Sequence, residues 1–475
     1  MTRPMSPPSL PITNDADLRG RDVLVLGLAR SGLAATRYLA SIGARVTAYD
    51  RRHAEALPDA VAALAGQPVE LALGIAPEAA ARLLAAADLI VSSPSISARF
   101  PTTEPWLRGA LADAEARGAQ VISEVDLFLR LTPTRVLGVT GTKGKTTTTA
   151  LLGAILERGG VPHVVGGNIG TPLIDRLPEL SADQWAVLEL SELQLPTISR
   201  GAELSLYTNI MADHLDRHGT VEAYRAVKAR LAELARGPVV LNADDPGSRE
   251  LAERLPQLDV AWYGMATGRA RVADARLTVD GTALLPVADV PLRGEHMLHD
   301  VLGAALAAQI AGVPADAVAA AIREFHGVAH RLETLGEWNG ILFVNDSQAT
   351  IPVATLAALR AFGERPIVLI AGGQGKGLDY AELAEAIATR CRAAVLIGET
   401  AGELEALIGG RLPVIRAGSM PEAVSAAAEW ALRGDVVLLS PAAASFDMFT
   451  DYAARGDAFR AAVATIGPGL GEGSR

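Results

Sequence analysis

The sequence predicts an α/β protein built from three domains. Short apolar runs alternate with helical stretches rich in Ala and Leu, which is typical of strands and crossover helices in parallel sheets. Four of the apolar runs lead into turns of small residues, at 21–52, 134–156, 364–377 and 434–449. A chain of 475 residues is long enough for several domains at roughly 100–200 residues each.

The domain boundaries are placed where these units separate. We expect a first domain over residues 1–123, a second over 124–327 and a third over 328–475. Four prolines stand among the first eleven residues, without the apolar core of a signal peptide. Residues 1–16 are therefore expected to form a disordered arm.

The overall composition argues against several classes of protein. The formal net charge is −11, which disfavours a nucleic-acid binder because such proteins present a basic face. No run of about 18 apolar residues occurs, so no membrane span is expected. The single cysteine, Cys391, cannot form an internal disulfide and suits a reducing compartment. The sequence therefore predicts a cytoplasmic protein.

The first domain is expected to begin with a strand, a glycine-rich turn, a helix and a second strand, and this second strand ends at Asp50. The turn, GLARSG at 27–32, lacks the middle glycine of a dinucleotide-binding fingerprint because Ala29 stands there. The helix N-terminus can still bind a diphosphate, and Asp50 can accept a hydrogen bond from a ribose or a base. A purely structural turn explains these residues equally well.

The second domain contains a phosphate loop, GVTGTKGKTT at 138–147, between a strand and a helix. We expect the backbone amides of 141–146 to face phosphate oxygens, Lys145 to reach the terminal phosphates and the hydroxyl of Thr146 to bind Mg²⁺. Val139 stands where the general pattern has glycine, so this is a variant loop. The alternative, a glycine-rich turn with surface lysines, is disfavoured by the flanking strand and helix.

Carboxylates and histidines end two further apolar runs of the second domain. Glu189 ends the run in WAVLELSELQL and is a natural partner for Mg²⁺, although a helix cap or a surface glutamate is the alternative. Asp213, His214, Asp216 and His218 follow the next run. Histidine would be an unusual ligand for Mg²⁺, which prefers oxygen.

Lysine is rare in this chain, and Lys228 is one of only four among 43 basic residues. It lies in a predicted amphipathic helix, 222–236, next to an apolar stripe of Tyr224, Val227, Leu231 and Leu234. A neutral lysine carbamylated by CO₂ becomes an anionic oxygen ligand, whereas arginine stays protonated at neutral pH. The alternative is a solvated surface lysine.

Nine motifs in order across 138–456 resemble those of the Mur ligases. They are GTKGKTT, GGNIG, LELSELQL, TNIMADHLDRHG, KARL, NADD, HRLE, NDSQAT and SPAAAS followed by RG. GLARSGLAA and YDRR near the N-terminus resemble the uracil-nucleotide domain of that family. The resemblance implies an N-terminal Rossmann-like UDP-binding domain, a central P-loop ATPase-type α/β domain and a C-terminal Rossmann-like domain that binds glutamate.

The activity implied by this resemblance is an ATP-dependent amide ligation in peptidoglycan precursor synthesis. D-Glutamate would be added to UDP-N-acetylmuramoyl-L-alanine through an acyl phosphate, giving ADP and phosphate. The implied cofactors are ATP, two Mg²⁺ ions and a CO₂-derived carbamate on Lys228. The implied protein is a monomer whose partners are UDP-N-acetylmuramoyl-L-alanine and glutamate, with no nucleic acid and no membrane span.

The resemblance also implies roles for individual residues. Catalysis would rest on Lys145, Asn168, Glu189, His214 and Lys228, and the metal ligands would be Thr146, Glu189, His214 and Lys228. ATP would contact Gly141, Thr142, Lys143, Gly144, Lys145, Thr146, Thr147, His330, Arg331 and Asp346. The UDP substrate would contact Ser31, Asp50, Arg51, Asn168, Ser191 and Gln194. Glutamate would contact Gln348, Thr350, Lys376, Ser445, Phe446 and Tyr452.

Some positions depart from the residues usual in the family. These are Ser95, Glu192, Leu193, Met297, Asp300 and Gln348. Gln348 replaces a common lysine and removes a positive charge near the glutamate site, so the same chemistry with L-glutamate, or another Mur-type amino-acid ligase, is the alternative. A folylpolyglutamate synthase is disfavoured by the first domain, a nucleotide-binding regulator would release no phosphate, and a dehydrogenase would bind NAD.

Overall fold

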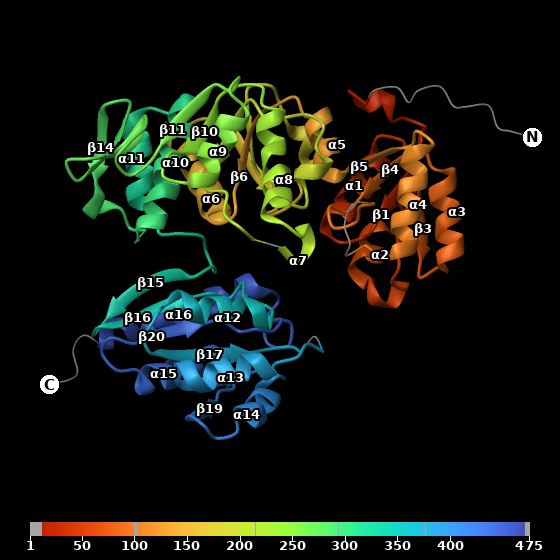
Figure 1. Cartoon of the computed structure of the whole chain (residues 1–475). Helices are drawn as coiled ribbons and strands as arrows, with labels where there is room; N and C mark the ends of the chain where they lie inside the picture. Colours follow the sequence, from red (N-terminus) through yellow and green to blue (C-terminus); the bar gives the residue numbers. More distant parts are fainter. Residues whose placement is uncertain (1–11, 99–102, 214, 293, 376, 471–475) are drawn as a thin grey trace, which may run out of the picture. The chain divides into compact units, whose positions relative to one another are not determined.

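The structure is a computed structural model that describes residues 12–98, 103–213, 215–292, 294–375 and 377–470. The chain divides into two compact units, Met1–Phe325 and His326–Arg475. Three separate sheets run through it, two in the first unit and one in the second, as Figure 1 shows. The predicted α/β class is confirmed, and each of the three predicted domains contains one of these sheets, whereas the exact boundaries at 123 and 327 stay predictions.

The first sheet has five parallel strands in the order β3-β2-β1-β4-β5. The strands are β1 (Asp22–Leu26), β2 (Arg45–Asp50), β3 (Val69–Leu73), β4 (Leu89–Ser92) and β5 (Gln120–Ser123). Helices α1 (Arg30–Ser41), α2 (Pro58–Leu64), α3 (Pro77–Ala86) and α4 (Pro105–Ala116) connect them. Alternate residues of β1 face opposite layers, since Val23 and Val25 pack with α1 while Leu24 and Leu26 pack with α3 and α4.

The second sheet has nine strands in the order β14-β13-β12-β11-β10-β9-β6-β8-β7. The strands from β6 to β12 pair in parallel: β6 (Arg135–Thr140), β7 (His163–Gly167), β8 (Trp185–Glu189), β9 (Leu204–Tyr207), β10 (Val239–Asn242), β11 (Val260–Tyr263) and β12 (Ala270–Ala273). An antiparallel extension follows in β13 (Arg276–Val279) and β14 (Thr282–Pro286). The chain crosses from one side of β6 to the other between β8 and β9, so ligands are expected beyond the carboxyl ends of these three strands.

Helices cover both faces of the second sheet. One face packs against α6 (Lys145–Arg158), α10 (Glu295–Ile310) and α11 (Ala315–Glu324). The other face packs against α5 (Glu124–Leu131), α8 (Val221–Glu233) and α9 (Pro246–Arg254). The short helix α7 (Leu215–His218) precedes α8, which begins where the Thr220 hydroxyl accepts a hydrogen bond from the Ala223 amide.

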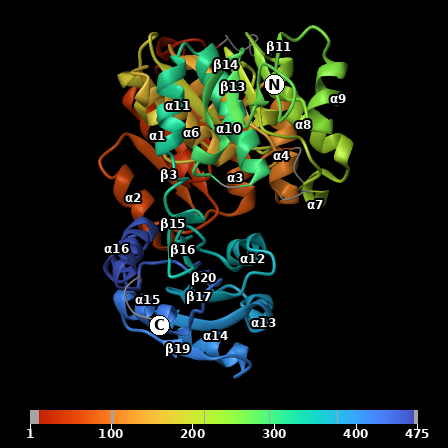
Figure 2. The same cartoon turned by 90° about the vertical axis from the view of Figure 1, so that its left-hand side faces the viewer.

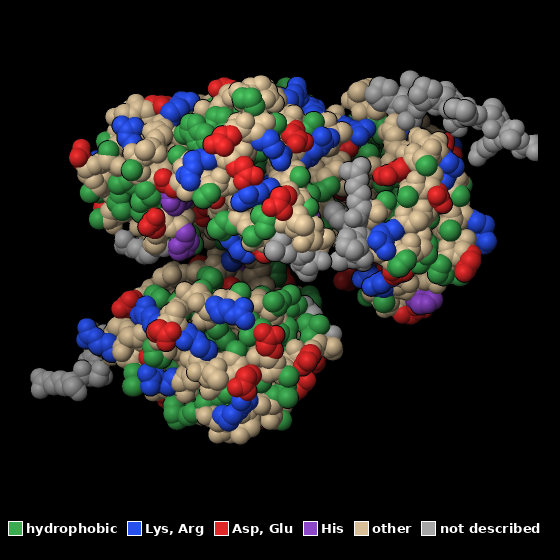
Figure 3. All heavy atoms as spheres, in the orientation of Figure 1, with side chains coloured by type: hydrophobic (Ala, Val, Ile, Leu, Met, Phe, Trp, Pro, Cys, Tyr) green, Lys and Arg blue, Asp and Glu red, His purple; other side chains and the backbone are tan. Residues whose placement is uncertain are grey.

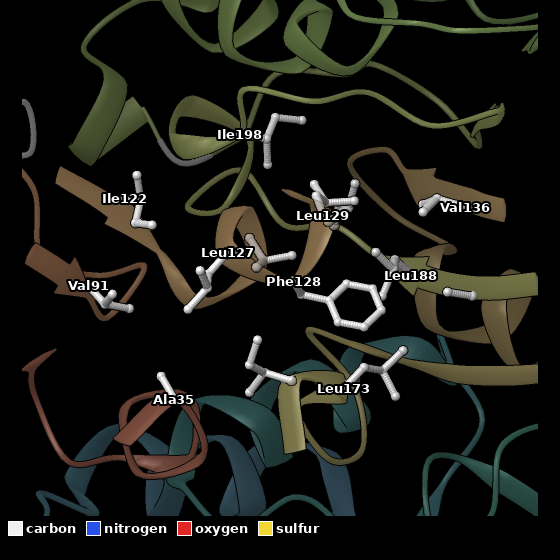
Figure 4. Close-up of a cluster of buried hydrophobic side chains, with 14 of the residues drawn as sticks. Ala35, Val91, Ile122, Leu127, Phe128, Leu129, Val136, Leu173, Leu188 and Ile198 are labelled. Carbon is white, nitrogen blue, oxygen red and sulfur yellow. The ribbon is translucent and has the colours of Figure 1, made fainter. Parts of the chain in front are cut away.

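A single hydrophobic cluster joins the first two sheets. Helix α5 directly follows β5, and its Phe128 is buried between residues of both sheets. Figure 4 shows Phe128 with Ile122 and Val91 of the first sheet on one side and Leu188 and Val136 of the second on the other. The turn η3 (Leu173–Glu179) closes the cluster through Leu173. This shared core explains why two sheets form one compact unit.

The third sheet has six strands in the order β15-β16-β20-β17-β18-β19. They are β15 (Glu333–Trp338), β16 (Ile341–Asn345), β17 (Ile367–Gly372), β18 (Cys391–Ile397), β19 (Val414–Arg416) and β20 (Val436–Leu439), and only β15 is antiparallel to its neighbour among these described strands. Helices α12 (Pro352–Ala361), α13 (Ala381–Arg390) and α14 (Ala401–Ile408) cover one face. Helices α15 (Met420–Trp430) and α16 (Tyr452–Leu470) cover the other, as Figure 2 shows.

The predicted disordered arm is wrong for its last five residues. Ile12 is buried in the core of the first unit, and residues 15–17 form a helical turn that is capped by the side chain of Asn14. Residues 1–11 lie outside the described part of the chain.

Figure 3 shows Lys and Arg side chains mixed with Asp and Glu side chains over the face in view. Among the described residues, the structure contains no helix with the length and apolar character needed to cross a bilayer.

Candidate active site

The phosphate loop connects β6 to α6 and depends on two glycines with positive φ. Gly141 has φ 147° and Gly144 has φ 84°. A Cβ atom on Gly141 would lie 1.9 Å from the Thr208 hydroxyl, and one on Gly144 would lie 2.2 Å from a carboxylate oxygen of Asp300. Both positions therefore require glycine for space as well as for backbone conformation. The sequence-predicted strand, loop and helix are all confirmed.

Hydrogen bonds to Asn209, just after β9, hold the phosphate loop in place. The Thr142 amide donates to the backbone oxygen of Asn209 at 2.9 Å, and the Lys143 amide donates to its side-chain oxygen at 3.0 Å. The expectation that all amides of 141–146 face phosphate is therefore wrong for these two. Their hydrogen bonds fix the loop, and the amides at the start of α6 remain as the anion-binding end of the helix.

The two lysines of the loop have different environments. The ammonium of Lys145, at the first turn of α6, donates to the backbone oxygen of Thr142 at 3.0 Å. The ammonium of Lys143 is exposed and pairs with Asp213 at 2.8 Å. Lys145 therefore lies over the loop, next to the helix N-terminus, where Thr146 and Thr147 also begin α6. This placement suits binding of terminal phosphates.

Glu189 lies at the end of β8, the strand next to β6. Its side chain is buried, and one carboxylate oxygen accepts a hydrogen bond from the side-chain amide of Asn168 at 2.7 Å. The other oxygen, Oε2, is buried and has no hydrogen-bond partner among the described residues. A buried carboxylate oxygen without a partner is costly, so this atom fits a bound cation. The alternative interpretations, a helix cap or a surface glutamate, are wrong.

Lys228 is fully buried on α8, so a solvated surface lysine is also wrong. Its Nζ donates to the backbone oxygen of Gly141 at 2.8 Å and contacts the Thr140 hydroxyl at 3.3 Å. Burial, assisted by the positive charge of Lys145, lowers the pKa of Lys228 to about 7. A neutral amine is therefore accessible near neutral pH directly under the phosphate loop.

Polar side chains continue from Glu189 along the end of β8. The backbone amide of Asn168 donates to the backbone oxygen of Glu189 at 2.9 Å, which places the GGNIG loop beside this strand end. The amide and the hydroxyl of Ser191 both donate to the side-chain oxygen of Gln194 at 3.0 Å. The structure therefore brings the predicted substrate contacts Asn168, Ser191 and Gln194 to the same strand end as Glu189.

A pocket of about 500 Å³ lies at the carboxyl ends of the first sheet. It lies where strand order reverses between β1 and β4, the expected ligand position in such sheets. Its lining residues are Gly27, Ala29, Tyr49, Asp50, Arg51, Arg52, Ser93, Ser95, Ile96, Thr103, Glu104, Trp106, Leu107 and Arg217. The predicted Asp50 and Arg51 line this pocket, whereas Ser31 stands in the first turn of α1 and is not among the lining residues.

Asp50 organises the floor of this pocket. Its carboxylate accepts from the Leu28 amide at 2.9 Å and from the Arg52 guanidinium at 2.9 and 3.0 Å. Burial acts to raise the pKa of Asp50, but the hydrogen bonds from Arg52 and Leu28 outweigh it and bring the pKa down to about 2. Arg51 pairs with Glu104 at 2.8 Å.

In the second unit, several predicted residues gather at the carboxyl ends of β16 and β20. The buried carboxylate of Asp346 accepts from the Leu332 amide at 3.1 Å and from the Ser440 hydroxyl at 2.8 Å, and burial raises its pKa to about 6. The backbone amide of Gln348 donates to the backbone oxygen of His330 at 3.0 Å, and the His330 ring contacts the Tyr452 ring edge to face.

The remaining predicted contacts of this unit lie on the same loops. Arg331 and Thr350 flank that group in the sequence, and Ser445 and Phe446 lie on the loop after β20. Ser445 is buried, whereas Phe446 is 66% exposed. Whether these residues bind nucleotide or glutamate stays a prediction.

Arg455 was missed by the sequence reasoning. It is fully buried, and its guanidinium donates to the backbone oxygens of Ala443, Ala444 and Ser347 at 2.9 to 3.1 Å. It therefore ties the SPAAAS turn to the NDSQAT loop. The available sequence signal is the RG pair at 455–456, which ends the last of the nine motifs.

Two predicted residues, His214 and Lys376, lie outside the described residues. Within the described ranges, no three His, Cys, Asp or Glu side chains gather into a metal site. The predicted ligand set does not require such a group, because it consists of Thr146, Glu189, His214 and a modified Lys228. The unpartnered Oε2 of Glu189 and the glycine-lined loop together fit Mg²⁺ and a nucleotide phosphate.

Three family models match successive parts of the chain. They are the Mur ligase MurD-like, N-terminal domain over residues 21–123, the Mur ligase middle domain over 139–308 and the Mur ligase, glutamate ligase domain over 330–443.

Relatives of known function match almost the whole length. UDP-N-acetylmuramoylalanine–D-glutamate ligase of Solibacter usitatus is 40% identical over 457 residues, covering 95% of this chain and 99% of the relative. The protein of the same name from Desulfitobacterium hafniense strain Y51 is 39% identical, covering 94% and 97%. Among solved structures, UDP-N-acetylmuramate-alanine ligase MurC from Thermotoga maritima shares the fold, with a TM-score of 0.52 at 16% identity over 94% of this chain and 99% of that one.

Replacing Gly144 with Ala tests the phosphate loop. The new Cβ would meet Asp300 at 2.2 Å in a backbone conformation that costs roughly 1–2 kcal/mol, so ATP affinity should fall about tenfold or more. Gly160→Ala is the matched control, because Gly160 also has positive φ but no atom of the described residues lies within 4 Å of its added Cβ. Calorimetric titration with ATP checks this, and equal losses in both variants would contradict the assignment.

The lowered pKa of Lys228 also predicts that the free energy of unfolding depends on pH. Its pKa is about 7 when folded and roughly 10.4 when unfolded, so between these values only the unfolded state binds the proton. The free energy of unfolding should therefore gain a rising contribution from about pH 7 to about pH 10.4. Lys228→Met should be more stable than wild type near pH 7 and lose that contribution.

Urea unfolding in CO₂-free buffer at both ends of this range measures the effect. Arg230→Met on the same helix is the control, because Arg230 is only partly buried and its guanidinium stays charged throughout. An unchanged pH slope in Lys228→Met would contradict the lowered pKa.

Proposed function

This chain belongs to the Mur ligase family, and we propose that it adds D-glutamate to UDP-N-acetylmuramoyl-L-alanine in an ATP-dependent ligation. The products are an amide, ADP and phosphate. The observation that carries this proposal is the meeting of the phosphate loop, the unpartnered oxygen of Glu189 and the buried amine of Lys228 at the ends of β6 and β8. Relatives that cover the chain almost end to end are named for this reaction.

The proposed chemistry has two steps that share one acyl intermediate. A carboxylate oxygen of the substrate attacks the γ-phosphorus of ATP, so an O–P bond forms and the bond to the ADP oxygen breaks. The amine nitrogen of glutamate then attacks the acyl carbon. The tetrahedral adduct expels phosphate, the nitrogen loses a proton, and an amide remains. Activation as an acyl phosphate gives the carbonyl a good leaving group.

The protein contributes position and charge. Lys145 and the N-terminus of α6 hold and neutralise the terminal phosphates. Asn168, Ser191 and Gln194 orient the carboxylate of the muramoyl-alanine substrate toward the γ-phosphate, because they lie at the same strand end as Glu189. When bound, Mg²⁺ ions offset phosphate charge, with Thr146 and Glu189 proposed to hold one ion and His214 and Lys228 the other.

We propose that Lys228 acts in its carbamylated form. Its neutral amine adds CO₂, forming an N–C bond and releasing one proton, and the product is an anion. The lowered pKa supports this step because it makes the reactive neutral amine available near pH 7. The change from cation to anion places negative charge under the phosphate loop, where a second Mg²⁺ ion requires oxygen ligands.

The second unit is proposed to provide the residues that bind glutamate and further residues that contact the nucleotide. His330, Arg331 and Asp346 would contact ATP, and glutamate would be bound by Gln348, Thr350, Lys376, Ser445, Phe446 and Tyr452. The support is that Asp346, just after β16, accepts a hydrogen bond from Ser440, just after β20, and that His330 contacts Gln348 and Tyr452. Gln348 provides an amide where many family members have a lysine.

The biological setting follows from the substrates. The reaction is a step of peptidoglycan synthesis, and we propose that it serves cell-wall formation, cell shape and cell division. ATP and a uracil-nucleotide substrate favour the cytoplasm. We propose a monomer, because the phosphate loop, the uracil-nucleotide pocket and the glutamate residues all come from one chain.

Phosphate release tests the proposed function. The purified chain with ATP, Mg²⁺ and UDP-N-acetylmuramoyl-L-alanine should release phosphate when D-glutamate is added and only at background level without an amino acid. L-Glutamate is the third arm, and dependence on it alone would mean that the pocket around Gln348 has the opposite stereochemical preference. Absence of release in every arm would overturn the proposal.

Chemical rescue tests the carbamate. Lys228→Ala should lose activity by at least about 100-fold, the loss typical of one electrostatic catalytic group, and millimolar to molar formate or acetate should restore part of it. Arg230→Ala, on the same helix, should lose little activity and show no response to the added anion. Full activity of Lys228→Ala without additive would exclude the carbamate role.

A further inference from the structure

The pocket of the first sheet receives one residue from a different part of the chain. Of the fourteen lining residues in the described part of the chain, thirteen lie between Gly27 and Leu107, within the first sheet and its loops. The remaining one, Arg217, belongs to α7, which follows β9 of the second sheet. Because the two sheets share one core through α5, Arg217 is held at this pocket by the fold of the first unit.

Arg217 changes the charge balance of the pocket. Arg52 pairs with Asp50 and Arg51 pairs with Glu104, and both carboxylates line the pocket beside their partners. These two pairs therefore cancel within the pocket wall. Arg217 pairs with Glu192, which is not among the lining residues. Among the described lining residues, the net positive charge consequently comes from Arg217.

The guanidinium of Arg217 is both oriented and incompletely bonded. One terminal nitrogen donates to Glu192 at 2.7 Å, and that glutamate side chain is only 10% exposed, so the pair is shielded from water. Its Nε is buried and has no hydrogen-bond partner among the described residues. A guanidinium presents five N–H donors in a rigid fork, and its geometry matches phosphate oxygens.

We propose that Arg217 is the positioning cation of this pocket and that it binds the diphosphate of the uracil-nucleotide substrate. This inference rests on the proposed function for the identity of the nucleotide. Glu192 orients the guanidinium from outside the pocket and leaves part of its donor fork for the ligand. The N-terminus of α1, next to the lining residues Gly27 and Ala29, provides further partial positive charge at this pocket.

Glu192 gives this chain a specific way to place the cation. The residue lies in the loop after β8, close in sequence to Glu189 and Ser191 at the phosphate-loop site. Its carboxylate pairs with the Arg217 guanidinium at 2.7 Å. The Glu192–Arg217 pair therefore links the loop beside the reacting carboxylate to the pocket for the nucleotide end of the same substrate.

Binding of UDP and of uridine tests the proposal, because the two ligands differ in the diphosphate alone. In calorimetric titrations of the full chain, Arg217→Gln should weaken UDP binding about 10–100-fold, the range for a hydrogen bond to a charged group. Uridine binding should change less than about threefold. Arg217→Lys keeps the charge without the fork and should lie between wild type and Arg217→Gln.

Two further variants separate charge from structure. Glu192→Gln breaks the same ion pair but keeps the cation, so it should retain a preference for UDP over uridine that Arg217→Gln loses. Arg225→Gln is the matched control, because Arg225 also pairs with a glutamate and its buried Nε has no partner in the described part of the chain, yet it is not a lining residue of this pocket. It should bind both ligands as wild type does.

The outcomes distinguish this proposal from the proposed function. Equal weakening of UDP and uridine by Arg217→Gln, or equal effects of Arg217→Gln and Glu192→Gln on the UDP preference, would overturn the positioning role. A wild-type chain that binds neither UDP nor uridine would instead overturn the uracil-nucleotide assignment. Wild-type binding of UDP with an unchanged Arg217→Gln variant would leave the proposed function standing and remove Arg217 from it.

Discussion

The active-site arrangement depends on the burial of one amine. Lys228 lies fully inside the second sheet's helical layer, with its Nζ bonded to the backbone oxygen of Gly141 directly beneath the phosphate loop. A buried ammonium is destabilising, and its neutral form is favoured at this position. The same contact links α8 to the end of β6, so the loop geometry and the chemistry of the amine are set by one interaction. A guanidinium at this position would remain charged and could not be converted into an anion.

Sheet topology places the other groups around this amine. The strand order of the second sheet puts the end of β8, with Glu189, and the end of β9, with Asn209, on either side of the phosphate loop. The strand order of the first sheet opens its pocket between β1 and β4. One core around Phe128 fixes these two sites relative to each other within the first unit. Under the proposed function, one compact unit would therefore hold both the nucleotide end of the substrate and its reacting carboxylate.

Sequence patterns were sufficient for features that are local in the chain. The strand, loop and helix around Lys145, the strand end at Glu189 and the helix that carries Lys228 follow from short apolar runs, glycines and helical periodicity. Features that depend on distant pairing were not predictable in this way. Asn209, after the neighbouring strand β9, accepts hydrogen bonds from two amides of the phosphate loop. Arg217 lines the pocket of the first sheet, and Arg455 donates to the backbone of two loops in the second unit. No local pattern determines which of many arginines becomes buried, because burial depends on strand order and on the packing of separate elements.

Carbon-13 NMR of the full chain in labelled bicarbonate with Mg²⁺ tests the central role of Lys228 most directly. The account predicts one protein-bound carbamate signal that is present in wild type and absent in Lys228→Met. A folded wild-type chain without such a signal, or a signal that persists in Lys228→Met, would contradict it.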